Sequence, residues 1–323
     1  MAAGLATAVV AVEAGGQPAP QPRSSVSVIN TKTNRLIGGA IKVGPYPSGI
    51  ALTPDGSRAY VVNARPIGNG SVAVIDTKRN RIERKEIEIG PDPEKIAISP
   101  NGRRAYVASY GNNTISAIDT ATNMLAIRGI KVGRGPVAVA VTPDGNYACV
   151  ANTRSGTLSV IDTATDRRAD RDIKVGRNPG AVAITPDGHR AYVANLRDDT
   201  VSVVDIAKRE AVKTIRVGNT PSAIAISPDG RRAYVANARS GTASMINITT
   251  NRPTPTTLKV GRRPTAIVIS PGGDRAYVAN LAGTVSVIDT VTGHRIGNPI
   301  EVGPFPLDLA LSPDGGRLYV AKN

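Results

Sequence analysis

The sequence predicts an all-β fold, a seven-bladed β-propeller of four-stranded antiparallel blades. Three observations predict it: a turn motif at nearly constant spacing, four short strand-like runs in each repeat, and chain ends that supply complementary parts of one repeat. The turn motif is Pro-x-Gly, and its successive copies are 42 to 46 residues apart. Its prolines are Pro54, Pro100, Pro143, Pro186, Pro228, Pro271 and Pro313.

Each repeat contains four short runs in which apolar residues alternate. The first run centres on a small residue, as in Ile50–Leu52, and the second follows the turn, as in Ala59–Asn63. The third run ends in Asp or Asn, as in Val72–Asp76, and the fourth ends in Gly, as in Ile41–Gly44. Short alternating runs bounded by turn residues form antiparallel strands, so each repeat predicts one blade. One such sheet cannot bury both of its faces alone, and neighbouring blades must therefore stack around an axis.

Recurring Gly, Asp and Asn residues are explained by the turns between these runs. Proline presets φ in the Pro-x-Gly turn, and glycine accepts a positive φ. The Asp or Asn at the end of the third run caps the following turn. Four residues later the sequence holds residues that tolerate a left-handed conformation, and Arg209 departs from this pattern. The expected left-handed residues are Asn34, Asn80, Asn123, Asp166, Asn251 and Gly293.

The two chain ends predict how the ring closes. Residues 25–30 have the pattern of a third strand and residues 318–321 that of a second strand, so the termini complete one shared blade. Closure removes exposed sheet edges, which favours a monomer. We therefore expect a single propeller domain over residues 24–323 and an Ala- and Pro-rich tail over residues 1–23.

The tail leaves two interpretations of the cellular compartment. Ala2–Val12 is an apolar run followed by small residues at 14–16, as in a secretory signal, although a basic start is missing. The alternative is a disordered tail. The first interpretation predicts a periplasmic, cell-surface or secreted protein, whereas the second permits a cytoplasmic one. No run of 18 apolar residues occurs, so no membrane span is expected.

The composition restricts the core and the chemistry. Aromatic residues are 3% and Trp is absent, so Val, Ile, Leu and Ala must form most of the core. Cys149 is the single cysteine, which excludes an intrachain disulfide, and its place in a strand predicts a buried apolar side chain. His189 and His294 lie in turns and assemble no metal or acid–base cluster. We therefore expect no cofactor, no metal and no catalytic residue.

Three motifs carry a resemblance to a known family. The Thr-Pro-Asp-Gly turn at 185–188, the Tyr-Val-Ala-Asn strand at 192–195 and the Val-Ser-Val-Ile-Asp-Thr strand at 285–290 resemble the YVTN repeats of bacterial seven-bladed propellers. The resemblance covers residues 24–323 and implies the propeller fold. Members of this lactonase-like or surface-layer-type group are often envelope or secreted proteins, and related folds include sugar-lactone hydrolases. Because a fold does not determine activity, the resemblance does not decide the function.

Loops that vary between repeats indicate the expected ligand face. Loops that enter the first strand and loops that leave the second lie on one face of a propeller, around the channel mouth. They hold ten basic and four acidic residues, a net charge of +6 within a chain of +15, although the opposite face is basic too. An insertion at 64–70 lies in one of these loops. The candidate ligand-binding residues are Arg65, Tyr110, Arg134, Arg154, Arg177, Arg197, Arg239, Arg262 and Arg263.

Three functions fit these observations. The leading hypothesis is a non-enzymatic binding or scaffold propeller of the cell envelope, because no catalytic cluster is visible. A lactonase-like hydrolase is the second, with Glu94, Asp198, Asp199 and Asp308 as acidic candidates. The third is binding of a polyanion, either nucleic acid or an acidic polymer, through the Arg-rich face. The partner itself, an anionic ligand or a protein, is left open.

Overall fold

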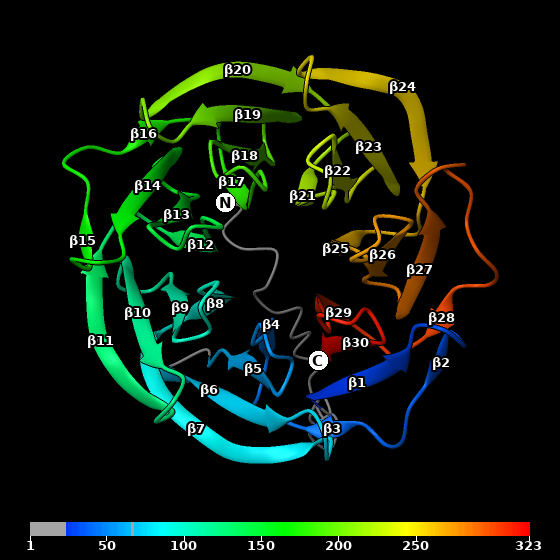
Figure 1. Cartoon of the computed structure of the whole chain (residues 1–323), viewed down its shortest axis with the longest axis horizontal. Helices are drawn as coiled ribbons and strands as arrows, with labels where there is room; N and C mark the ends of the chain where they lie inside the picture. The colour runs from blue at the N-terminus through cyan, green and yellow to red at the C-terminus, as the bar shows by residue number, and fades with distance from the viewer. Residues whose placement is uncertain (1–23, 66–67) are drawn as a thin grey trace, which may run out of the picture.

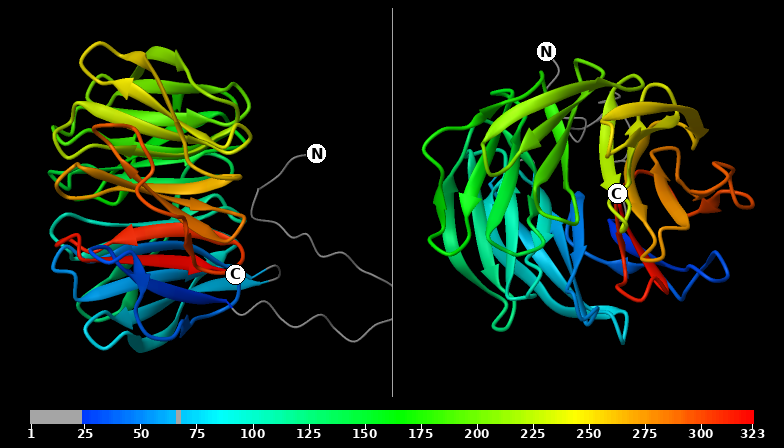
Figure 2. Two further views of the ribbon diagram at one scale, coloured as in Figure 1. Left: turned by 90° about the vertical axis from the view of Figure 1, so that its right-hand side faces the viewer. Right: turned by 45° about the horizontal axis from the view of Figure 1, so that its top comes forward.

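A computed structural model describes residues 24–65 and 68–323, and the expected tail over residues 1–23 lies outside them. The described chain forms seven antiparallel sheets arranged as blades around a central axis (Figure 1). Seen from the side, the ring is a disc (Figure 2). The predicted all-β, seven-bladed fold is confirmed. Across the residues described, no helix is long and apolar enough to cross a membrane.

In each blade the first strand lies nearest the axis and the last lies at the rim (Figure 1). Six blades are continuous in sequence. Their strands, from axis to rim, are β4 (Pro47–Leu52), β5 (Arg58–Asn63), β6 (Asn69–Asp76) and β7 (Arg81–Pro91); β8 (Pro93–Ile98), β9 (Arg104–Ser109), β10 (Thr114–Asp119) and β11 (Met124–Lys131); β12 (Pro136–Val141), β13 (Tyr147–Asn152), β14 (Thr157–Asp162), β15 (Arg167–Arg168) and β16 (Ile173–Lys174); β17 (Pro179–Ile184), β18 (Arg190–Asn195), β19 (Thr200–Asp205) and β20 (Glu210–Arg216); β21 (Pro221–Ile226), β22 (Arg232–Asn237), β23 (Thr242–Asn247) and β24 (Arg252–Lys259); β25 (Pro264–Ile269), β26 (Arg275–Asn280), β27 (Thr284–Asp289) and β28 (Ile300–Glu301).

The seventh blade joins the two ends of the chain. Strands β29 (Pro306–Leu311) and β30 (Arg317–Lys322) come from the C-terminal side, and β1 (Ser25–Asn30), β2 (Arg35–Leu36) and β3 (Ile41–Lys42) come from the N-terminal side. β1 pairs with β30 along its whole length, so that Val28 lies opposite Tyr319. The predicted ring closure is thus present, and it leaves no blade incomplete.

The rim strand departs from the expected regular pattern in three blades. It is split into β2 and β3 in the seventh blade and into β15 and β16 in another, and β28 has only two residues. Glycines interrupt two of these rim segments, at Gly38–Gly39 and at Gly293 and Gly297. Glycine disfavours extended strands, which accounts for the interruptions there.

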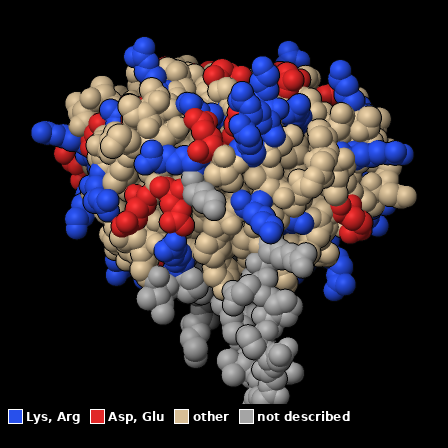
Figure 3. Space-filling view, turned by 90° about the horizontal axis from the view of Figure 1, so that it is seen from below, with Lys and Arg blue, Asp and Glu red and all other residues tan. Residues whose placement is uncertain are grey.

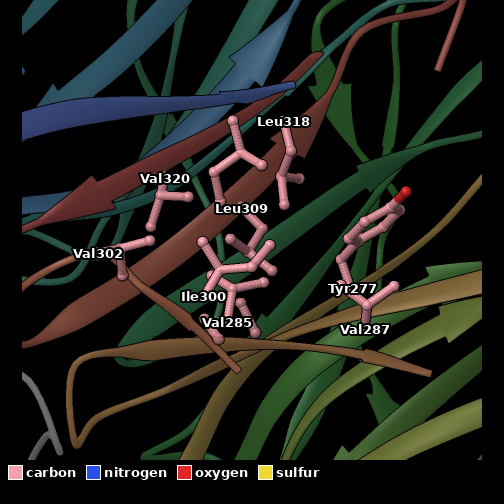
Figure 4. Packing of buried hydrophobic residues seen from close by; sticks show 11 residues of the cluster. Tyr277, Val285, Val287, Ile300, Val302, Leu309, Leu318 and Val320 are labelled. Atoms are coloured by element: carbon pink, nitrogen blue, oxygen red, sulfur yellow. The ribbon is translucent and has the colours of Figure 1, made fainter. Parts of the chain in front are cut away.

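The hydrophobic core is divided among the contacts between blades. Seven clusters of buried residues are present, and each combines side chains of two neighbouring blades. Figure 4 shows one of them, in which Tyr277 and Val285 pack with Leu309 and Leu318 of the next blade.

Cys149 is fully buried, as expected, and burial raises the pKa of its thiol to about 12. The thiol therefore stays protonated and unreactive at neutral pH.

Tyrosine and arginine side chains form hydrogen bonds across five of the seven contacts between blades, on one side of the disc. This side carries the Pro-x-Gly turns, such as residues 53–58, and is called the turn face. Arg58 Nη1 donates to the carbonyl of Thr120 at 3.1 Å, and Tyr60 donates its hydroxyl to Asn123 Oδ1 at 2.5 Å. Arg317 Nη1 repeats the contact to Thr77 at 2.7 Å. Part of the basic character of the turn face is therefore structural.

A close glycine–asparagine contact fixes the loops on the other side of the disc. This side, called the loop face, carries the loops between blades and those between second and third strands, such as 217–220 and 238–241. A Cβ added to Gly176 would lie 2.5 Å from the side chain of Asn195, whose Nδ2 donates to Ser202 Oγ at 2.9 Å. The same contact occurs at Gly44, Gly133, Gly218 and Gly261, with Cβ distances between 2.4 and 2.8 Å.

The contact with asparagine explains why glycine is required at these positions, where the sequence pattern suggests a turn with a positive φ. Gly44 and Gly176 do not have a positive φ, so their role is close approach rather than turn conformation. The expected left-handed residues after the third strand do have a positive φ, from 50° to 56° at the Asn and Asp positions. Arg209 has a φ of 56° as well, because the flanking strands impose the turn.

We predict that Gly176→Ala lowers the free energy of unfolding by about 1–3 kcal/mol, since the new methyl group overlaps the buried Asn195. Gly39→Ala is the matched control: its added Cβ meets nothing within 4 Å, and its effect is expected to stay below about 1 kcal/mol. Urea denaturation of both variants checks this. Equal effects of the two substitutions would contradict the role of the glycine–asparagine contact.

Candidate functional site

The loop face has one residue in the left-handed conformation at the same position of all seven loops between blades. In each loop, the residue two positions after the glycine that ends the fourth run of the repeat, such as Gly44 or Gly176, has a positive φ between 48° and 66°. Only the residue type changes from blade to blade: Tyr46, Asp92, Gly135, Asn178, Thr220, Arg263 and Phe305. A left-handed conformation costs a bulky residue energy that glycine avoids. The loops thus form a fixed frame in which the side chains vary, which is the expected character of a binding surface.

Several of the candidate arginines are paired within the loop face. Arg65 Nη2 lies 3.0 Å from Glu86 Oε1, and Arg177 Nε lies 2.5 Å from Asp198 Oδ1. The guanidinium of Arg154 stacks over the ring of Tyr110, with its carbon 4.5 Å from the ring centre. The charge of Arg65 and Arg177 is therefore partly balanced by neighbouring carboxylates, and the face of Tyr110 is covered.

Two acidic candidates hold loops in place. Asp198 Oδ2 accepts the backbone N–H of Arg177 at 2.6 Å, which lowers the pKa of the carboxyl. Asp199 Oδ1 accepts the backbone N–H of Thr220 at 2.8 Å. Both carboxylates thus bind amides of the loops that precede first strands. The structure does not bring them together with Glu94 or Asp308, and the described residues contain no group of three His, Cys, Asp or Glu side chains suited to a metal ion.

A cationic groove lies on the loop face between the β22–β23 and β24–β25 loops. It has a volume of about 760 Å³ and is lined by Arg239, Lys259, Arg262, Arg263 and Arg295 without any carboxylate. Arg295 comes from the segment between β27 and β28, in the next blade. All five side chains are exposed, and none takes part in an ion pair with any residue that the structure describes.

The sequence of this region explains why the groove is not neutralised. Residues 230–273 contain seven Lys and Arg residues and no Asp or Glu. Even the carboxylate that ends most third strands is replaced here, by Asn247. By contrast, Lys and Arg alternate with Asp and Glu on the rim near β7 (Figure 3). Opposite charges screen one another on that rim, whereas the groove keeps a concentrated positive potential.

The walls of the groove are tied to one another by backbone hydrogen bonds. Val260 N donates to the carbonyl of Gly241 at 3.2 Å, and Leu281 N donates to that of Arg263 at 3.0 Å. Gly261 also lies against Asn280 through the contact described above. The backbone of the groove therefore loses little conformational entropy when a ligand binds.

A second polar cluster lies at the innermost strands. Lys95 Nζ on β8 lies 3.1 Å from Asp308 Oδ2 on β29 and donates to the carbonyl of Ser48 at 2.8 Å. Asp308 Oδ2 also accepts the N–H of Ile50 at 3.0 Å. The ion pair passes over β4, where Gly49 contributes no side chain and a Cβ would lie 2.7 Å from the carbonyl oxygen of Glu94. Three blades are thereby linked near the axis.

Glu94 has an unusual protonation equilibrium. Its side chain is largely surrounded by protein and keeps only part of its surface accessible. Burial and, to a smaller extent, the nearby Asp92 raise the pKa of this carboxyl from its ordinary 4.5 to about 7, against the opposing effect of Lys95. Near neutral pH the group therefore exchanges protons readily, which is the property of a general acid or base.

Sequence reasoning identified Arg239, Arg262 and Arg263 but missed Lys259 and Arg295 in the groove, and it did not pair Lys95 with Asp308. The acid-free stretch 230–273 is the signal that could have indicated the groove. Arg295 belongs to another repeat, and no pattern within one repeat places it beside Lys259.

The raised pKa of Glu94 leads to a pH-dependent prediction. The folded protein binds this proton more tightly than the unfolded chain, so the stability gained is complete below about pH 4.5 and is lost as the pH rises through 7. Glu94→Gln should be similar to the native protein in stability at pH 5 and more stable at pH 8, by on the order of 3 kcal/mol. Thermal unfolding between these pH values measures it.

Glu301→Gln, which changes an exposed carboxylate on β28, is the control and should show no such trend. A native protein and a Glu94→Gln variant that keep the same stability difference from pH 5 to pH 8 would refute the raised pKa.

Comparisons with known proteins agree with the fold. A family model described as "Lactonase, 7-bladed beta-propeller" matches residues 168–258, less than a third of the chain. No match was found among curated proteins. Among solved structures, hydrazine synthase of Kuenenia stuttgartiensis aligns with 86% of this chain and 93% of its own, at 23% identity and a TM-score of 0.77. These likenesses support a seven-bladed propeller and do not confirm membership of the YVTN-repeat family.

Proposed function

We propose that this protein is a non-enzymatic binding propeller that recognises an anionic ligand on its loop face. The observation that carries the proposal is the cationic groove, in which five unpaired basic side chains meet without a carboxylate. Guanidinium groups donate forked hydrogen bonds to phosphate, sulfate and carboxylate groups, so a surface of this kind is suited to anions. Folding alone does not require such a concentration of charge, since like charges repel.

The charges elsewhere on the disc strengthen this interpretation. On the turn face, Arg58 and Arg317 serve the contacts between blades. On the loop face, Arg65 and Arg177 are paired with carboxylates. The groove differs from these places, because none of its five basic side chains has an ion-pair partner among the described residues.

We further propose that the protein works in the cell envelope, as a periplasmic, cell-surface or secreted component. The support is the resemblance to envelope propellers together with the apolar run Ala2–Val12, which lies outside the described residues. A closed ring, in which the seventh blade is completed by both ends of the chain, supports a monomer.

The proposal predicts that charge on the loop face, and not total charge, controls anion binding. Reversal of Arg134, Arg197 and Arg262 to Glu should abolish binding of inorganic polyphosphate at 0.15 M salt. Reversal of the exposed turn-face residues Arg103, Lys208 and Arg231 should leave most of it. In the native protein the affinity should fall steeply with salt, because bound counterions are released. Isothermal titration calorimetry over a salt series measures both effects, and equal losses from the two faces would refute the proposal.

A lactonase-like hydrolase is the second candidate. The family match at residues 168–258 and the Glu94 carboxyl favour it, although the matched segment does not include Glu94. In such a reaction Glu94 would take a proton from water while the water oxygen attacks the lactone carbonyl. The proton would then pass to the ring oxygen as its bond to the carbonyl carbon breaks.

This candidate predicts turnover of small lactones by the purified protein, with a rate that rises as Glu94 loses its proton near pH 7. Glu94→Gln should reduce the rate at least a hundredfold, whereas Glu301→Gln should not change it. Titration of the released acid over a panel of lactones measures the rate. Absence of turnover with every ring size would exclude the candidate.

A further inference from the structure

We infer that the cationic groove binds an acidic polysaccharide, a sugar chain that carries repeated carboxylate or sulfate groups. The inference rests on the proposed function, because it names the ligand class for the same loop face. Five basic side chains from two blades line the groove, which has a volume of about 760 Å³. A single small anion would balance only one or two of them, whereas a chain with repeated charges can contact several at once.

The lining residues favour sugar over nucleobase. No aromatic side chain lines the groove. Recognition of single-stranded nucleic acid draws much of its affinity from bases stacked on aromatic rings, and nothing in the groove supplies such a ring. Tyr110, an aromatic candidate of the loop face, lies in another blade and is covered by Arg154.

Hydroxyl groups complete the lining in a way that suits sugars. Ser240 Oγ accepts the backbone N–H of Asn219 at 2.9 Å, and Thr242 Oγ1 accepts from Asn237 Nδ2 at 3.2 Å. Each hydroxyl therefore uses a lone pair within the protein and keeps its own hydrogen to donate. Fixed donors of this kind, beside forked guanidinium groups, can bind sugar hydroxyls and acidic groups together.

The backbone holds these groups in place before any ligand arrives. Arg263 has a φ of 53°, a left-handed conformation that is unfavourable for a side chain of its size. Its neighbour Gly261 cannot accept a Cβ without displacing Asn280. A rigid loop thus maintains the strained backbone, so that binding does not have to order the backbone of Arg262 and Arg263.

Binding of three probes to the full chain tests the inference: heparin as a sulfated polysaccharide, polygalacturonate as a carboxylated one, and a single-stranded DNA oligonucleotide. Three double variants, each losing two positive charges, separate the surfaces. They are Arg262→Gln with Arg263→Gln in the groove, Arg134→Gln with Arg197→Gln elsewhere on the loop face, and Arg103→Gln with Arg231→Gln on the turn face. Thermal unfolding confirms that each variant folds.

We expect at least one polysaccharide to bind, and the groove variant to lose tenfold or more in affinity with a smaller salt dependence. The other two variants should lose less than threefold. Binding of heparin alone would assign sulfate as the recognised group, and binding of polygalacturonate would assign carboxylate, and either supports the inference.

The remaining outcomes overturn it. Equal loss from the groove and from Arg134 with Arg197 would mean that the loop face binds anions without a dedicated groove, and the proposed function would then stand alone. Tighter groove-dependent binding of DNA than of either polysaccharide would replace the inferred class by nucleic acid. Failure of all three probes to bind would refute this inference, and if inorganic polyphosphate also failed to bind, the proposed function would be refuted with it.

Discussion

Burial of apolar side chains between neighbouring blades is the constraint on which the rest of the structure depends. One four-stranded sheet of about 43 residues exposes two apolar faces, and only two neighbours can cover both. The seven buried clusters are shared in this way, so the ring must close or leave one cluster open to water. Pairing of β1 with β30 provides that closure. The clamps from Arg58 and Tyr60 reinforce the same contacts at the turn face.

This arrangement separates residues that maintain the ring from residues that are free to vary. On the loop face, the contact between Gly176 and Asn195 and its four counterparts fixes the backbone at five of the seven loops between blades. The residue two positions later has the same left-handed φ in every loop, yet it is Gly135 in one blade and Arg263 in another. A rigid frame with variable side chains allows a single blade pair to acquire a binding groove without disturbing the other five.

The architecture could be predicted from the sequence because the same pattern of strands and turns recurs in every repeat. Strand number, turn positions and closure follow from patterns within one repeat, and the structure agrees with them. The site was only partly predictable, because its residues meet across repeats. Arg262 and Arg263 could be identified in a loop, but Arg295 reaches the groove from the next blade. Likewise, the ion pair of Lys95 and Asp308 depends on Gly49, which lies in the blade between them.

Total charge is a poor guide to the binding surface of this protein. A net charge of +15 would suggest that any face could attract polyanions. The structure divides that charge into arginines that clamp blades, arginines paired with carboxylates such as Asp198, and a remainder. Part of the remainder lies in residues 230–273, which have no acid, so that the field of the groove is not cancelled by a carboxylate of its own segment. Since salt screens the distant charges of the ring more than it screens closely spaced ones, the groove should dominate anion binding at physiological ionic strength.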